Sequence, residues 1–340
     1  MAKVGQKLAS RYVVKSVIGR GGMGEVFLAK DMQEEKNVAI KTIQPISPNP
    51  NEQKHFLKHF QEEAELLSRL SHSNLVQVFE HFTSGDTAYM VMELVRGANL
   101  YEESKQRSQP FQVRIVLKWA NQILDVLDYL HSQPKPVIVR DIKPHNIVLR
   151  DSGDICLIDF GIAREIAPGK ETATVLKGIG SEGFAPLEQY GQGTTDKRTD
   201  IYALGATLYY LLTLSVPPSA VVRATGQESL ENLCSLNPDV DNELATAIEI
   251  MLKLSPGERP SSIQEVRRLG PFFKDTSPVP TSVSRREKPP IIVKQLKQPS
   301  HPKQADQIPP PQTPGEVVLS FLWCIVVGLV LFAIYFLGYY

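Results

Sequence analysis

The chain has 340 residues, enough for one large domain of two lobes. Its 37 basic and 37 acidic residues cancel, and without a basic arm or arginine-rich run the sequence gives no reason to expect a nucleic-acid partner. Three widely separated cysteines exclude a disulfide scaffold and a cysteine zinc site, which indicates a reducing compartment. The first ten residues lack the apolar core of a signal peptide, so we expect the N-terminus in the cytoplasm.

The first motif is a glycine-rich stretch, VIGRGGMGEVFLAKD, at residues 17–31. Gly19, Gly21 and Gly24 form a G-x-G-x-x-G pattern between two segments rich in β-formers, and no helical period follows it. In a dinucleotide-binding fold these glycines would instead open a helix. We therefore predict a hairpin whose bare backbone approaches the phosphates of a ligand. A plain flexible turn is the alternative.

A strand is predicted next at residues 37–43, NVAIKTI, with Lys41 near its centre. The following segment, residues 51–71, has an apolar stripe at helical spacing that comprises Phe56, Phe60, Leu67 and Leu70. Glu63 shares the face of this stripe, and a carboxylate that points inward needs a cation. Lys41 is the candidate partner. The alternative is that Glu63 lies at the edge of the stripe and reaches water.

Polar residues then gather between two short apolar runs in VIVRDIKPHNIVL, residues 137–149. Because charges are seldom fully buried unless they are paired, we expect the loop that carries Arg140, Asp141, Lys143 and Asn146 to open onto a cleft.

A second apolar strand, in ICLIDFGIAR at residues 155–164, ends at Asp159. Two carboxylates and an amide, on Asp141, Asp159 and Asn146, could face the glycine hairpin and Lys41. This set suits a magnesium–triphosphate, since the oxygens are hard metal ligands and the lysine and backbone N–H groups bind phosphate.

Two uncharged runs follow, and they differ in length. The run at residues 201–214 is too short to cross a bilayer and is predicted to be a buried helix.

The second run follows a linker. Residues 275–316 hold ten prolines and no aromatic residue, which is typical of a disordered tether. The run at residues 317–340 is long enough to span a membrane as a helix, with a fully buried soluble helix as the alternative.

The flanks of this last run favour a membrane span. Aromatic residues lie toward its ends, at Trp323, Tyr335, Tyr339 and Tyr340. Four lysines precede it, at Lys288, Lys294, Lys297 and Lys303, so the positive-inside rule predicts that residues 1–316 are cytoplasmic. Small residues recur every four positions at Ser320, Cys324 and Gly328, which leaves open either a homodimer through this helix or chance spacing.

The motifs GRGGMGEV, VAIK, RDIKPHN and DFG follow one another in the order and rough spacing of the eukaryotic-type protein kinases. Over residues 10–272 the chain resembles the bacterial membrane-anchored (Hanks-type) serine/threonine kinases. The resemblance implies an α+β, bilobal protein-kinase-like fold, with a small β-rich N-lobe at about 10–95 and a large, mainly helical C-lobe at about 96–272. The expected organisation is a kinase domain at 1–274, the linker at 275–316 and a single membrane helix at 317–340 that anchors the cytoplasmic kinase domain to the cell membrane.

The resemblance also implies a site for ATP between the lobes. Its predicted residues are Ile18, Gly19, Gly21, Gly22, Gly24, Val26, Ala39, Lys41, Glu63, Met92, Glu93, Val95 and Val148. The glycines would cover the phosphates, and Lys41, fixed by Glu63, would hold the α- and β-phosphates. In the hinge, residues 89–97, Met92 would be the gatekeeper. Glu93 and Val95 would offer backbone groups to adenine.

For the chemistry, the resemblance implies that Asp141 accepts or orients the proton of the substrate hydroxyl and that Lys143 steadies the phosphoryl group. Asn146 and Asp159 would ligate Mg²⁺, or Mn²⁺ in its place. Lys143, two residues after Asp141, resembles the serine/threonine branch.

Downstream, GSEGFAPLEQY at residues 180–190 looks like the loop that docks a protein substrate. The resemblance implies that Glu188 pairs with Arg259 and that Asp200 holds the catalytic-loop backbone. In the activation loop, residues 162–185, Thr172 and Thr174 are the expected phosphate acceptors, and Arg140 would bind the phosphate. The alternative is that both threonines are ordinary solvated residues.

One departure from the family is Val139, where a histidine usually precedes the Arg-Asp pair. A valine cannot donate the histidine hydrogen bond, which is worth about 0.5–1.5 kcal/mol. Three functions are therefore weighed: an active serine/threonine protein kinase that also phosphorylates itself, a nucleotide-binding pseudokinase scaffold, and a kinase-fold enzyme for a small metabolite. Residues 186–190 favour protein substrates.

Overall fold

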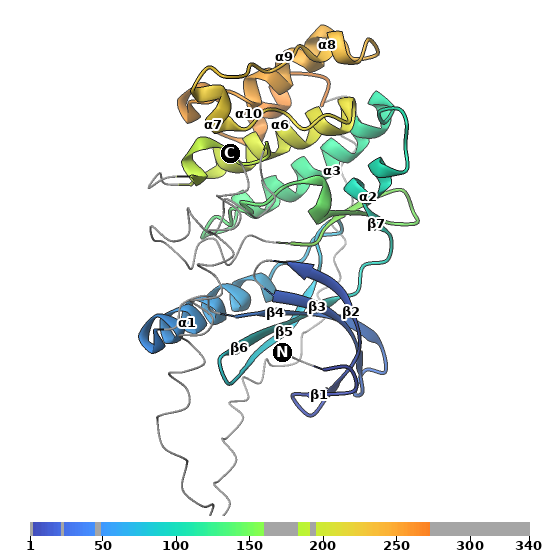
Figure 1. The fold of residues 1–340 in the computed structure, drawn as a ribbon, viewed down its shortest axis with the longest axis vertical. Helices are drawn as coiled ribbons and strands as arrows, with labels where there is room; N and C mark the ends of the chain where they lie inside the picture. Colours follow the sequence, from blue (N-terminus) through green and yellow to red (C-terminus); the bar gives the residue numbers. More distant parts are fainter. Residues whose placement is uncertain (1–2, 22–23, 45–48, 160–182, 191–194, 273–340) are drawn as a thin grey trace, which may run out of the picture. The chain divides into compact units, whose positions relative to one another are not determined.

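The computed structural model begins with an antiparallel sheet that one helix covers (Figure 1). It describes residues 3–21, 24–44, 49–159, 183–190 and 195–272, all within one compact unit. The strand order is β1-β2-β3-β4-β6-β5. The strands are β1 (Lys7–Leu8), β2 (Tyr12–Gly21), β3 (Gly24–Asp31), β4 (Asn37–Ile43), β5 (Val78–Ser84) and β6 (Thr87–Glu93).

The predicted glycine hairpin is confirmed, because β2 and β3 pair antiparallel with Gly21 opposite Gly24. Gly24 has a φ of +153°, and a Cβ there would lie 1.9 Å from the carbonyl oxygen of Thr42. Only glycine fits this close approach of two strands.

Helix α1 (Pro50–Ser68) begins at a recognisable start signal. The side chain of Asn49 accepts a hydrogen bond from the backbone N–H of Asn51, and Pro50 occupies the first helical position, where its missing N–H costs nothing. The predicted apolar stripe is confirmed, since Phe56, Phe60, Leu67 and Leu70 are all buried. The helix packs through this stripe against the sheet, chiefly on β5.

The second part of the fold is mainly helical and carries a small antiparallel sheet in the order β7-β8-β9. The sheet consists of β7 (Ala98–Asn99), β8 (Ile147–Leu149) and β9 (Ile155–Leu157). The α-helices are α2 (Leu100–Lys105), α3 (Val113–His131), α6 (Lys197–Thr213), α7 (Ala220–Ala224), α8 (Leu233–Leu236), α9 (Asn242–Met251) and α10 (Ile263–Arg268). Short 3₁₀ turns are η1 (Pro144–Asn146), η3 (Leu187–Gln189) and η4 (Pro256–Glu258).

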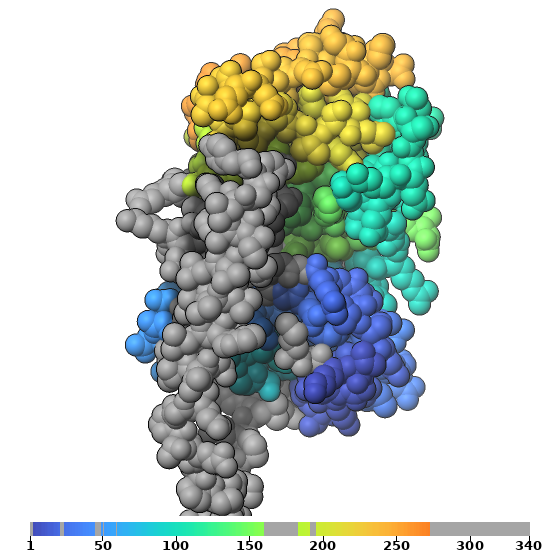
Figure 2. Space-filling model, viewed as in Figure 1, coloured from blue at the N-terminus to red at the C-terminus, as the bar shows by residue number. Residues whose placement is uncertain are grey.

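Helix α6 contains the predicted buried run up to Thr213, with Leu214 as its C-cap, and its residues 199–212 are all buried. It contacts α3, α8 and α9, so apolar residues are needed on all of its sides (Figure 1). Its side chains belong to the larger of two hydrophobic clusters, which continues through α3 and β9 to α1. The smaller cluster covers the opposite face of the six-stranded sheet, around Phe27, Ile40 and Val91. Figure 2 shows the strands β1–β4 (blue) and the C-terminal helices (orange) as separate regions at opposite ends of the described molecule.

Among the described residues, no helix combines the length and apolar character needed to cross a membrane. The predicted linker at 275–316 and the predicted membrane helix at 317–340 lie outside the described residues.

The predicted pair between Glu188 and Arg259 is confirmed as a buried, bidentate ion pair. Two nitrogens of the Arg259 guanidinium donate to the two Glu188 carboxylate oxygens at 2.7 and 3.1 Å. Arg259 also donates to the carbonyl oxygens of Arg198, Lys253 and Leu254, and its guanidinium lies over the ring of Tyr202. Every donor of this buried cation thus has a use, which is what makes its burial tolerable.

Because removal of one partner leaves an uncompensated buried charge, we expect Arg259→Met to lower the free energy of unfolding by roughly 3–5 kcal/mol. The measurement is urea unfolding at neutral pH. The control is Arg267→Met, which removes the pair with Asp125, a carboxylate that is half exposed. Its cost should not exceed about 1 kcal/mol. Equal losses in the two variants would contradict the assignment of Arg259 as a structural anchor.

Candidate active site

Four of the predicted nucleotide-binding residues share one face of the six-stranded sheet. Val26 of β3 is paired with Lys41 of β4, and Ala39 is paired with Met92 of β6. Cross-strand partners point to the same face, as do residues two apart on one strand. Val26, Ala39, Lys41 and Met92 therefore line a single surface below the glycine hairpin.

Lys41 forms an ion pair with Asp159, which lies two residues beyond β9; the ammonium nitrogen and Oδ1 are 2.5 Å apart. This contact joins the six-stranded sheet to the helical part of the fold. The ion pair that the structure describes for Lys41 is thus with Asp159 and not with Glu63, the partner predicted from the sequence. Glu63 of α1 is partly exposed.

The other polar residues of the site form a second cluster on the loop 140–146. Lys143 lies 3.0 Å from Oδ2 of Asp141, and the amide nitrogen of Asn146 donates to both Oδ2 and the backbone carbonyl of Asp141, each at 2.8 Å. The backbone N–H of Ile158 donates to the carbonyl of Asn146 at 3.0 Å. This bond connects the cluster to the segment that carries Asp159.

Both donations from Asn146 use its amide nitrogen, so its amide oxygen remains as an acceptor. Asp159 likewise uses Oδ1 for Lys41. The two remaining oxygens are hard ligands of the kind that Mg²⁺ prefers, and the donor set fits that metal.

Asp200 holds the loop from below, as predicted from the resemblance. Its buried carboxylate accepts hydrogen bonds from the backbone N–H groups of Val139 and Arg140 at 2.9 and 2.8 Å, and His131 of α3 contacts Oδ2 at 2.8 Å. Arg140 has a φ of +63°, a conformation that costs energy for a residue with a side chain. The side chain of Gln189 donates to its carbonyl, so both sides of the strained peptide are fixed.

Val139 is fully buried, and its backbone N–H is used by Asp200. The substitution of histidine by valine therefore leaves the support of the loop backbone in place.

The remaining predicted residues lie at three places. Val148 of β8 is buried, Glu93 ends β6, and Val95 follows it with partial exposure. Ile18 of β2 is half exposed. Gly22 lies outside the described residues, as do Thr172 and Thr174.

Sequence reasoning missed several residues that support the loop. His131 and Gln189 act on it as described above, and the Thr195 hydroxyl accepts from Nε of Arg140 at 3.0 Å. His145, between Lys143 and Asn146, stacks on the ring of Tyr101. Burial, and then the charge of Lys143, lower the pKa of His145, which favours its neutral imidazole. The only available signal for His145 was its place inside the polar loop 140–146. The contacts of His131, Gln189 and Thr195 join residues about 50 to 70 positions apart, so no local pattern indicates them.

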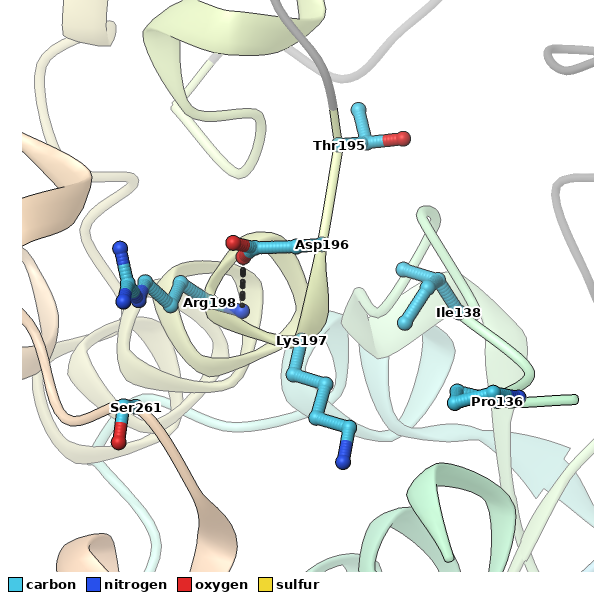
Figure 3. A pocket seen from close by; sticks show the side chains of 7 residues that line it. All are labelled: Pro136, Ile138, Thr195, Asp196, Lys197, Arg198 and Ser261. Atoms are coloured by element: carbon cyan, nitrogen blue, oxygen red, sulfur yellow. Dashed lines mark hydrogen bonds between the residues drawn. The ribbon is translucent and has the colours of Figure 1, made fainter. Parts of the chain in front are cut away.

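A cavity of about 330 Å³ lies at the start of α6, and no predicted nucleotide-binding residue is among those that line it (Figure 3). It is lined by Pro136, Ile138, Thr195, Asp196, Lys197, Arg198 and Ser261. The side chain of Asp196 accepts from the backbone N–H of Arg198 and so caps the helix.

Comparisons with known proteins agree with this geometry. A family model described as the protein kinase domain matches residues 12–269. The serine/threonine-protein kinase PrkC of Bacillus subtilis is 36% identical over 63% of this chain and 32% of its own length. Serine/threonine-protein kinase D of a Synechocystis species is 34% identical over 76% of this chain and 51% of its own length. The chain thus spans about a third to a half of the length of these relatives.

Solved structures with the same fold include one described as the apo form of PpkA-294. It has a TM-score of 0.64 and 30% identity over 79% of this chain and 99% of its own. The kinase domain of Mycobacterium tuberculosis PknI has a TM-score of 0.63 and 25% identity over 79% of this chain and 99% of its own. The chain therefore belongs to the protein kinase family, and the curated relatives it resembles are bacterial serine/threonine-protein kinases.

Because asparagine has one oxygen where aspartate has two, Asp200→Asn turns an NH₂ group toward one of the loop N–H groups. We expect it to lower the free energy of unfolding by about 1–3 kcal/mol and to speed hydrogen exchange at the amides of Val139 and Arg140. The control is Asp196→Asn at the exposed cap of the same helix, where both residue types cap equally well. Unchanged exchange in Asp200→Asn would refute its role as the support of this loop.

Proposed function

We propose that this chain transfers the γ-phosphoryl group of ATP to serine and threonine hydroxyls of proteins, itself included. The observation that carries the proposal is the meeting of the Asp141 cluster with the Lys41–Asp159 pair beneath the glycine hairpin. A lysine, two carboxylates and an amide at one place are the groups that phosphoryl transfer requires.

Each group then has one task. Lys41 binds the α- and β-phosphates, and the backbone of the glycine hairpin covers them. Asp141 orients the acceptor hydroxyl and accepts its proton as the new P–O bond forms, while the bond to the ADP oxygen breaks. Lys143, already 3.0 Å from Asp141, balances negative charge on the transferred group.

Asn146 would hold Mg²⁺ through its amide oxygen, and Asp159 through Oδ2, the carboxylate oxygen that does not contact Lys41. The metal supplies neutralising charge to the phosphates. The protein does little covalent chemistry in this scheme, and its contribution is position and electrostatics.

In this proposal Ala39 and Met92 form apolar walls for adenine, and Val148 forms its floor. All three side chains are buried, Ala39 and Met92 on the sheet face below the hairpin and Val148 on β8. The N–H of Glu93 donates to the carbonyl of Gln77, so the backbone group of Glu93 that would bind adenine is its carbonyl.

Replacement of the proton acceptor tests the reaction. We expect Asp141→Asn to lower kcat at least about a hundredfold, the usual contribution of a positioned base, while ATP still binds. The assay is transfer from labelled ATP with Mg²⁺ to a generic protein acceptor and to the chain itself, with the modified residues mapped and Thr172 and Thr174 as the expected sites. Asp151→Asn, in the exposed turn after β8, is the control.

An inactive wild type that binds ATP would instead favour the pseudokinase scaffold. Transfer to a small metabolite but to no protein would favour the third function.

We also propose that residues 317–340 anchor the kinase domain to the cytoplasmic face of the cell membrane. The support is the uncharged length of this run, its aromatic ends and the lysines before it. A homodimer through Ser320, Cys324 and Gly328 belongs to the same proposal.

A double substitution, Val326→Arg with Leu331→Arg, tests the anchor. Each arginine near the centre of a span costs about 2.5–3.5 kcal/mol of insertion energy. We expect the wild-type chain in the membrane fraction after alkaline extraction and the double variant in the soluble fraction, with Val293→Arg in the linker as the control. A wild-type chain that alkaline extraction releases would contradict the anchor.

A further inference from the structure

Residues 73–77, between α1 and β5, lie between the hinge and the sheet of the helical part. The backbone N–H of Leu157 donates to Asn74, and the N–H of Val76 donates back to Leu157, at 2.8 and 2.9 Å. On the hinge side, the N–H of Glu93 donates to the carbonyl of Gln77 at 2.8 Å. This segment thus links the end of β6 to β9.

One side chain completes the link. The guanidinium of Arg150 donates to Oε1 of Glu93 at 3.1 Å, to Sγ of Cys156 at 3.2 Å and to the carbonyl of Ser73 at 3.2 Å. These acceptors belong to the hinge strand, to β9 and to the segment after α1. A planar, multivalent guanidinium can reach three such acceptors at once, which a lysine ammonium on a flexible stem does less well.

The backbone of Arg150 is fixed as well. Arg150 directly follows β8 and starts the tight turn to β9, in which its N–H donates to the carbonyl of Asp154 and its own carbonyl accepts from Gly153. Val148, the proposed apolar floor for adenine, lies two residues earlier on β8. The spacing between this floor and the hinge therefore depends on where Arg150 holds Glu93.

We propose that Arg150 is a positioning residue for nucleotide binding: it clamps the hinge residue Glu93 to the β8–β9 turn and so fixes the hinge relative to the adenine floor. The inference rests on the proposed function, because it acts through the ATP site. A site held in its binding geometry loses less conformational freedom when the ligand arrives, so the clamp raises affinity without touching the ligand.

The competing explanation is an ordinary surface ion pair. The Arg150 side chain is 30% exposed and that of Glu93 is 36% exposed, and exposed pairs alone contribute little. The contact to Cys156 argues for more than that, because this thiol is fully buried in β9. A surface pair would change stability slightly but would leave nucleotide affinity untouched.

The test uses the full chain and measures the Kd for ATP with Mg²⁺ directly, beside KM for ATP, kcat and KM for the protein acceptor. For Arg150→Ala we expect Kd and KM for ATP to rise about three- to tenfold, the range for loss of one ion pair with two further hydrogen bonds. The values of kcat and of the acceptor KM should stay within about twofold.

The matched control is Lys118→Ala. Lys118 forms an ion pair with Asp154 at 2.9 Å and so binds the same β8–β9 turn, but it does so from α3 and not from the hinge. Its loss should leave the Kd for ATP unchanged. Arg150→Lys should recover part of the affinity. A double-mutant cycle with Glu93→Gln should show that the effects of the two substitutions overlap.

The outcomes separate the two proposals. If the wild type binds ATP and Arg150→Ala binds it equally well, or no worse than Lys118→Ala, the positioning role is refuted and the proposed function stands. A fall in kcat with an unchanged KM for ATP also refutes it. If the wild type binds no ATP, the proposed function itself fails, and this inference fails with it.

Discussion

The buried carboxylate of Asp200 is the contact on which the catalytic loop depends. It lies on a helix that other helices surround, at a depth where an unpaired charge would cost several kcal/mol. It is tolerated because two backbone N–H groups and His131 contact its oxygens. The same three contacts hold Arg140 in its strained left-handed conformation. Stability and loop geometry thus depend on the same buried carboxylate, from which the loop begins.

A second constraint connects the sheet to the helical part through Lys41 and Asp159. Lys41 is placed by sheet register, which also puts Val26, Ala39 and Met92 on the same face. Asp159 is placed by β9, whose residue Leu157 pairs with the segment after α1. The sequence offered Lys41 as the cation for Glu63, because Glu63 shares the apolar face of its helix. In the structure the carboxylate that follows β9 meets the lysine.

Local patterns predicted those parts of the fold that local physics specifies. The α1 stripe, the buried α6 run and the glycine hairpin each follow from periodicity or backbone freedom within about twenty residues, and each is confirmed. The Glu188–Arg259 pair and the support from Asp200 came from the family resemblance. The contacts of Arg150, Thr195 and Gln189 had no such signal, since polar residues in turns are usually solvated.

By itself, the sequence determined which residue types are available and in which order: a glycine hairpin, a strand lysine, a polar loop between two apolar runs, and a carboxylate after a strand. Those features arise from nearest neighbours along the chain, so sequence spacing carries them. Only the tertiary structure decided which charges meet, since Lys41 and Asp159 are 118 residues apart and Arg150 and Glu93 are 57 apart. Pairing over such separations depends on how buried strands and helices pack, and a side chain joins the nearest partner that packing leaves within reach.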